Sequence, residues 1–196
     1  LKRSTKQNLS HGPRQVLCAL LAAVFVLSLA GCGSGSASFE MVRHLSDVLP
    51  VMPAPRWVLN QVQPIAIRDT LHYLAACAEL AEPAQGTYDI GGPSTYSYAQ
   101  LMKIYARVAG LREPSIWPLP LLTPRLASHW VNLVTPLPHT LASALVQSLQ
   151  HDCVMGSREI DALIAPPVEG LCDYPRAVQL ALEKMDADAV QTSWAT

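Results

Sequence analysis

The stretch that decides the fold reads Thr87-Tyr88-Asp89-Ile90-Gly91-Gly92-Pro93. Residues 87–90 favour a short strand, and the two glycines and the proline that follow favour a tight turn. Beyond the turn, Ser97 and Gln100 have the spacing of a capping box, in which each side chain bonds the backbone N–H of the other residue. The pattern therefore predicts a strand, a turn and an amphipathic helix that ends at Gly110.

Other helices and strands are predicted before this stretch. Apolar residues at three- and four-residue spacing predict a helix over 38–49 with Ser38 as its N-cap. An alternating run predicts a strand over 57–67. Asp69 then stands where it would cap a helix over 70–81. The buried stripe of that helix would be formed by its apolar residues, Leu71, Leu74, Ala75 and Ala78.

Strands and helices also alternate after the stretch. Residues 115–119 predict a strand, 158–164 a helix, and 175–186 a last helix with a proline in its first turn. The predicted fold class is α/β. We expect three parts: an N-terminal apolar segment over 1–32, a body over 33–156 and a helical extension over 157–196.

The charges exclude one large class of function. Four of the fourteen Lys and Arg residues precede Cys32, where there is no acid, so the rest of the chain has ten of them against fifteen Asp and Glu. An acidic body without a basic cluster argues against nucleic-acid binding. No Cys-x-x-Cys pair and no His spacing suits a metal. We expect free, buried thiols at Cys77, Cys153 and Cys172.

Residues 1–32 have the layout of a secretory signal, with a basic region, an apolar region and then small residues. The ending Leu29-Ala30-Gly31-Cys32 resembles the lipobox of bacterial lipoproteins, which makes Cys32 a candidate lipidation site and predicts membrane association. Alternatively, residues 24–35 form a buried strand and its following loop. If the chain, which starts with Leu1, is a fragment, a cytoplasmic location is expected.

Residues 87–93 and the segment Gln63-Pro64-Ile65-Ala66-Ile67-Arg68-Asp69 together resemble a known family. They are similar to the C-terminal half of the atypical or extended short-chain dehydrogenase/reductases, NAD(P)-binding proteins of the NAD-dependent epimerase/dehydratase or NmrA-like kind. The resemblance covers residues 33–156 and implies a partial Rossmann-type fold. It places the loop over 33–40 near the nicotinamide, which makes Gly33 and Ser34 cofactor-binding candidates.

The same resemblance implies a substrate-facing segment over 119–134. His129 and Trp130 in that segment, together with Arg68, are candidates for a pocket that takes a small-molecule or a lipid- or quinone-like ligand. The alternatives are a core position for His129 and Trp130 and, for the Arg68-Asp69 pair, a helix cap at Asp69.

Two features that these enzymes need are missing from the sequence. A glycine-rich turn of the type Gly-x-Gly-x-x-Gly, which holds the cofactor pyrophosphate, does not occur. The catalytic Tyr with a Lys four residues later does not occur either, because Tyr98 and Lys103 are five residues apart. No catalytic residue is assigned, and the NAD(P) cofactor is implied by the resemblance alone.

We therefore predict a substrate-side half of such a protein that is not catalytic alone. A lipid-anchored secreted binding module is one alternative. A non-catalytic accessory subunit is another, since relatives of this fold serve as such parts of respiratory complex I.

Overall fold

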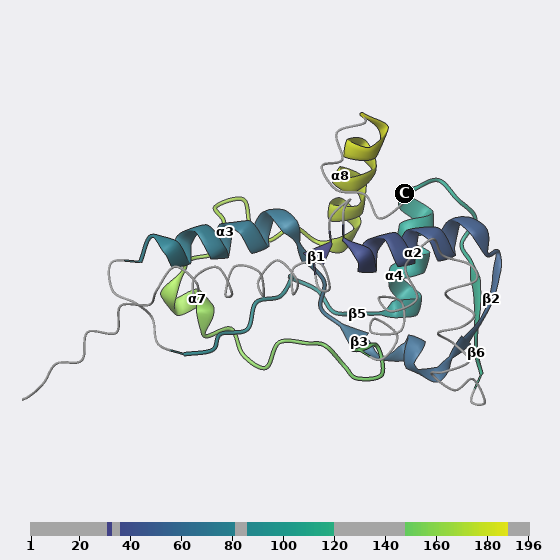
Figure 1. The fold of residues 1–196 in the computed structure, drawn as a ribbon, viewed down its shortest axis with the longest axis horizontal. Helices are drawn as coiled ribbons and strands as arrows, with labels where there is room; N and C mark the ends of the chain where they lie inside the picture. Colours follow the sequence, from purple (N-terminus) through teal and green to yellow (C-terminus); the bar gives the residue numbers. More distant parts are fainter. Residues whose placement is uncertain (1–30, 33–35, 81–85, 120–147, 188–196) are drawn as a thin grey trace, which may run out of the picture.

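The structure is a computed structural model and describes residues 31–32, 36–80, 86–119 and 148–187 (Figure 1). Its strands form three pairs in these ranges. β1 (Gly31–Cys32) is parallel to β4 (Ile65–Ala66), and β2 (Val51–Pro55) is parallel to β6 (Ser115–Leu119). β3 (Gln61–Val62) is antiparallel to β5 (Tyr96–Ser97).

The described helices lie between and after these strands. They are α2 (Ala37–Val48), a 3-10 helix η1 (Arg56–Leu59), α3 (Ile67–Ala78), α4 (Tyr98–Val108), α7 (Ile160–Leu163) and α8 (Tyr174–Asp186). Parallel strands need a long crossover connection. Accordingly, the chain passes through α2 between β1 and β4, and through α3 and α4 between β2 and β6. The α/β class is confirmed, whereas the predicted N-terminal apolar segment lies outside the described residues, apart from Gly31 and Cys32 in β1.

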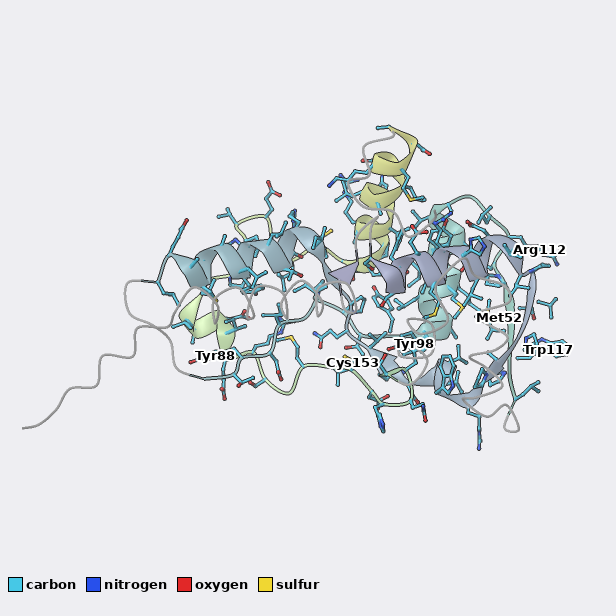
Figure 2. All side chains as sticks on the ribbon, viewed as in Figure 1. Met52, Tyr88, Tyr98, Arg112, Trp117 and Cys153 are labelled. Atoms are coloured by element: carbon cyan, nitrogen blue, oxygen red, sulfur yellow. The ribbon has the colours of Figure 1, made fainter. Side chains whose placement is uncertain are left out.

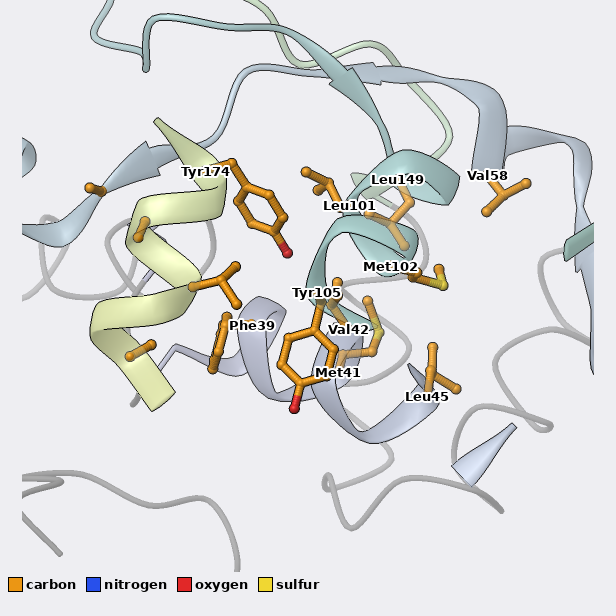
Figure 3. Close-up of a cluster of buried hydrophobic side chains, with 14 of the residues drawn as sticks. Phe39, Met41, Val42, Leu45, Val58, Leu101, Met102, Tyr105, Leu149 and Tyr174 are labelled. Carbon is orange, nitrogen blue, oxygen red and sulfur yellow. The ribbon is translucent and has the colours of Figure 1, made fainter. Parts of the chain in front are cut away.

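A larger hydrophobic core lies between α2, α4 and α8 (Figure 3). Phe39 of α2 meets Tyr105 of α4 edge to face, with ring centroids 6.0 Å apart. Tyr174 and Val178 of α8 are buried in the same cluster. The C-terminal extension thus shares a core with the body, and the domain boundary at residue 156 stays a prediction.

A smaller core lies at the other end of the molecule, beside α3 and α7 (Figure 1). Its buried residues are Ile65, Tyr73, Ile160 and Ile164. Ile65 and Ala66 are neighbours in β4, but Ile65 packs in the smaller core and Ala66 in the larger one. Because side chains alternate across a strand, this two-residue strand joins both cores.

The local signals around α4 are confirmed. Ser97 N donates to Gln100 Oε1 at 2.7 Å, and Gln100 N donates to Ser97 Oγ at 3.2 Å, so the capping box is complete. Gly110 follows the helix with φ of 69°, a left-handed conformation that glycine adopts without strain. The strand over 115–119 and Pro175 in the first turn of α8 are also confirmed.

Two predicted helix caps are wrong. Ser36, not Ser38, caps α2, because its hydroxyl accepts from Phe39 N at 3.1 Å and the helix begins at Ala37. Asp69 is the third residue of α3 and does not cap it; its carboxylate is fully buried and accepts from Cys172 N at 2.6 Å. The Asp69 carboxylate therefore binds the distant backbone N–H of Cys172 and not an N–H in the first turn of its own helix.

The predicted buried stripe of α3 is also wrong. Leu71 and Leu74 are 55% and 40% exposed, and the helix instead buries Thr70 and Tyr73. Thr70 Oγ1 donates to Ala66 O at 3.2 Å and Tyr73 OH donates to Asp161 Oδ1 at 3.0 Å. Because they are hydrogen-bonded, these polar atoms can be buried. The spacing of apolar residues does not predict such hydrogen bonds.

Two predicted strands are changed. Residues 87–90 pair with no strand in the described ranges. The segment is held by side chains: the Asp89 carboxylate accepts from Gly156 N at 2.9 Å, and Tyr88 and Ile90 pack on the smaller core. The run over 57–67 is divided into η1, β3 and β4. Pro64 stands between β3 and β4, where it has no N–H to give to a ladder.

The turn at Gly91 and Gly92 is a junction of three segments. A Cβ on Gly92 would lie 2.0 Å from Pro64 O, so only glycine fits there. Gly92 O accepts from Gln63 Nε2 at 2.7 Å and from Arg158 at 3.1 Å. Gln63 Oε1 in turn accepts from Met155 N at 3.0 Å. The turn thereby fixes both the Gln63-Pro64 corner and the start of the 155–158 segment.

Replacing Gly92 with alanine tests this junction. We expect Gly92→Ala to lower the free energy of unfolding by about 2–3 kcal/mol, because a backbone carbonyl must move to admit the methyl group. The control is Gly156→Ala, whose Cβ would meet only a side-chain oxygen of Asp89 at 3.2 Å, with an expected loss of about 0.5 kcal/mol. Urea unfolding measures both. Equal midpoints for the two variants would contradict the assignment.

Candidate functional site

A cavity of about 230 Å³ lies where α2, α4, the β3–β4 corner and the segment over 148–153 meet. Its walls are mainly apolar and include Phe39 and Val42 of α2, Leu101 of α4 and Leu149. These residues also belong to the larger core (Figure 3), so the cavity borders that core. Ser38 and Phe39, in the first turn of α2 after its N-cap Ser36, line the cavity.

The volume limits what the cavity can hold. Pockets for drug-sized ligands measure about 300–1,000 Å³, and a dinucleotide is larger than most drugs. The cavity is therefore of a size that suits a small molecule. Its described lining contains no Lys, Arg, His, Asp or Glu, so it offers no charge to a pyrophosphate.

Tyr98 is the main unsatisfied polar group of the cavity. It is the first residue of α4, directly after the N-cap Ser97, and lines the cavity together with Cys153 (Figure 2). Its hydroxyl has no hydrogen-bond partner among the described residues, whereas Gln63 is already bonded to Gly92 and Met155. Among the described residues, Trp57 Nε1 is the one buried side-chain N or O atom without a partner. The Tyr98 oxygen also has no partner but is not among the buried atoms, so solvent or a ligand can reach it.

The surroundings keep this phenol protonated. Burial, followed by the nearby Cys153 and Asp152, raises the pKa of Tyr98 from 10.0 to about 12. Each of these causes disfavours the phenolate, because burial and neighbouring negative charge both destabilise an anion. Tyr98 therefore presents an O–H donor throughout the neutral pH range.

Cys153 lies beside Tyr98 and is a free, exposed thiol (Figure 2). Its backbone is fixed to β3, since Cys153 N donates to Gln61 O at 2.8 Å and Gln63 N donates to Cys153 O at 2.9 Å. The prediction of buried thiols holds for Cys172 and is wrong for Cys77 and Cys153, which are exposed. Cys77 is exposed because α3 buries the face with Thr70 and Tyr73 and not the predicted face with Leu71 and Leu74.

Arg68, a predicted substrate contact, is bonded to the protein itself. Its guanidinium donates to Asp69 Oδ1 at 3.0 Å, to Glu169 Oε2 at 3.1 Å and to Gly170 O at 2.9 Å. It does not line the cavity. These bonds tie the start of α3 to the loop before α8, and a substrate contact by Arg68 stays a prediction.

The remaining candidates lie in or next to parts that are not described. Gly33, Ser34, His129 and Trp130 lie outside the described residues. Of Cys32, only the backbone is described, and it pairs with Ala66 in the β1–β4 ladder. None of these residues can therefore be placed at the cavity, and their roles stay predictions.

The cavity residues Tyr98, Gln63 and Cys153 were not proposed from the sequence. Tyr98 was considered only for a Tyr–Lys pair, which its distance from Lys103 excludes. The available signal was its place directly after the N-cap Ser97, which puts its side chain in the first turn of a helix. Gln63 and Cys153 carry no such signal, because a lone amide and a lone thiol have no diagnostic spacing.

In the described ranges, no group of three or more His, Cys, Asp or Glu side chains could hold a metal ion. No helix in that part of the chain is long and apolar enough to cross a membrane.

The fold is similar to that of a solved reductase. It matches triphenylmethane reductase of Citrobacter sp. with a TM-score of 0.55 and 13% identity, over 74% of this chain and 48% of the reductase. A second structure of that reductase, in complex with NADP(H), gives a TM-score of 0.54 and 14% identity, over 72% and 48% of the two chains. The chain thus spans about half the length of the reductase.

No protein-family model and no curated protein matches the sequence. The likeness to the reductase therefore concerns the fold. It defines the class: an α/β fold that resembles part of a Rossmann-like, NAD(P)-binding reductase. The fold agrees with the resemblance that residues 63–69 and 87–93 indicate, whereas the assignment to the C-terminal half stays a prediction.

The ionisation of Tyr98 can be measured directly. The difference in near-ultraviolet phenolate absorbance between the wild type and Tyr98→Phe should titrate at about pH 12 and not at 10.0. The folded state holds this proton more tightly than the unfolded state. Its contribution to stability is therefore complete below about pH 10 and is lost as the pH rises through about 12. A difference titration centred near 10 would show that the phenol is not shielded.

Proposed function

We propose that this chain is the substrate-side half of a Rossmann-like, NAD(P)-dependent reductase or epimerase, and that it binds a small molecule without catalysing its reaction alone. The observation that carries the proposal is the apolar cavity, lined by the Tyr98 phenol, in a fold similar to about half of a reductase. The NADP(H) complex of that reductase supports the cofactor class.

Three features support the separation of binding from catalysis. The sequence has no glycine-rich turn for a pyrophosphate and no Tyr with a Lys four residues later. The described cavity lining offers no cation, and its volume of about 230 Å³ is small for a dinucleotide. A hydride donor would have to come from residues or a subunit beyond the described cavity. The chain thus supplies a substrate wall and lacks the cofactor cradle.

A cofactor titration tests the proposal. We expect NADPH to give no saturable quenching of the fluorescence of Trp57, Trp117 and Trp130, which corresponds to a Kd above about 1 mM. N-acetyltryptophanamide serves as the control for light absorbed by NADPH, and a cooperative urea transition shows that the chain is folded. Saturable quenching at micromolar NADPH would overturn the proposal.

A second candidate is a lipid-anchored binding module at a membrane, which the ending Leu29-Ala30-Gly31-Cys32 favours. In this reading Cys32 carries the lipid and the cavity still binds the small molecule. In this reading Cys32 becomes the N-terminus, so of the β1–β4 pair only Cys32 opposite Ala66 would be retained.

Labelling with a fatty acid in bacterial cells tests the anchor. If Cys32 is lipidated, the wild type and the control Cys18→Ala are labelled, and Cys32→Ala is not. Cys18 is a suitable control because it lies inside the apolar region and not at its end. An absence of label from all three chains would reject the lipoprotein.

A further inference from the structure

We infer that the cavity selects a neutral molecule of one or two rings with one acceptor oxygen, such as a ketone, and that the Tyr98 hydroxyl donates a hydrogen bond to that oxygen. The inference rests on the proposed function, because it names the class of small molecule that the substrate-side half would bind. It follows from the size, the charge and the polar groups of the cavity.

Size sets the upper limit. An apolar protein cavity of about 150 Å³ takes up benzene. At about 230 Å³, the present cavity has room for a second small ring but not for a long chain or several separate rings. Its aromatic and aliphatic walls, Phe39, Val42 and Leu101 among them, suit such a compact apolar body.

Charge excludes ions. No described lining residue carries a full charge near neutral pH, and an unpaired ion in an apolar site is strongly disfavoured. Asp152, which acts electrostatically on Tyr98, lies next to Cys153 in the sequence, and its carboxylate accepts from Gln61 N at 2.7 Å. Its negative charge would further repel a carboxylate or phosphate. A neutral ligand is therefore selected.

The polar groups decide which neutral ligand binds best. Gln63 is engaged on both sides of its amide, and Ser38, Ser148 and Tyr174 also have partners. Tyr98 and the thiol of Cys153 remain, and a thiol is a weak donor. The Tyr98 O–H, which stays protonated, is thus the strong donor that the cavity offers, and it favours a carbonyl oxygen over a plain hydrocarbon.

The experiment compares three bicyclic probes of nearly equal size: 1-tetralone, tetralin and tetrahydronaphthoate. Their Kd values are measured by calorimetry on the wild type, on Tyr98→Phe and on the control Tyr88→Phe. Tyr88 packs on the smaller core and does not line the cavity. Urea unfolding checks that each variant is folded.

We expect the affinity of tetralone relative to tetralin to fall about fivefold in Tyr98→Phe, which is the size of one lost neutral hydrogen bond. Tyr88→Phe should leave that ratio unchanged. The carboxylate should bind at least about tenfold more weakly than the ketone. A ratio that is the same in Tyr98→Phe and the wild type would overturn the inference, and so would a carboxylate that binds as well as the ketone.

The two exposed thiols locate the bound probe. Cys153 lines the cavity and Cys77 does not, so both can be followed in one alkylation experiment by mass spectrometry. Bound tetralone should slow iodoacetamide at Cys153 several-fold and leave the rate at Cys77 unchanged. Equal rates at Cys153 with and without the probe would place binding elsewhere and overturn the inference.

Failure of this inference and failure of the proposed function give different results. If tetralin binds and protects Cys153 but tetralone shows no dependence on Tyr98, the small-molecule site stands and the role of Tyr98 is rejected. If none of the three probes binds, both the ligand class and the small-molecule function are rejected.

Discussion

The contact between Gly92 and the carbonyl of Pro64 is the constraint on which the rest of the structure depends. There is no space for a side chain at this crossing, because a Cβ would lie 2.0 Å from Pro64 O. The crossing holds the Gln63-Pro64 corner, which is a wall of the cavity, and through Gln63 and Arg158 it also holds the segment that follows Cys153. One glycine thus positions two sides of the candidate site.

A second set of contacts joins the two cores behind this crossing. β4 sends Ile65 to the smaller core and Ala66 to the larger one. Three residues on, the buried Asp69 carboxylate accepts from Cys172 N at 2.6 Å and secures the loop before α8. The next residue, Asp173, caps α8 through Tyr174 N and accepts from Tyr96 OH of β5 at 2.9 Å. Short strands that would be marginal alone are stabilised by these buried, charge-assisted hydrogen bonds.

The chemistry of the site follows from what this framework encloses. A small apolar cavity with the protonated phenol of Tyr98 in its described lining suits a neutral molecule. The fold is similar to about half of a reductase that has been solved with NADP(H), and the assignment of this chain to the substrate side is the function proposed above.

What the sequence by itself determined was the local structure. The capping box at Ser97 and Gln100, the left-handed Gly110, Pro175 in the first turn of α8 and the α/β class all follow from interactions within a few residues. Tertiary contacts decided the rest. Asp69 accepts from the N–H of Cys172, 103 positions away, and does not cap its own helix. Thr70 and Tyr73, not Leu71 and Leu74, form the buried face of α3. Tyr98 and Cys153 became cavity neighbours because β3 pairs with β5, which directly precedes Tyr98, and also bonds the backbone of Cys153. Buried hydrogen bonds between distant segments do not appear in any periodic pattern, and for that reason the cavity could not be predicted from the sequence.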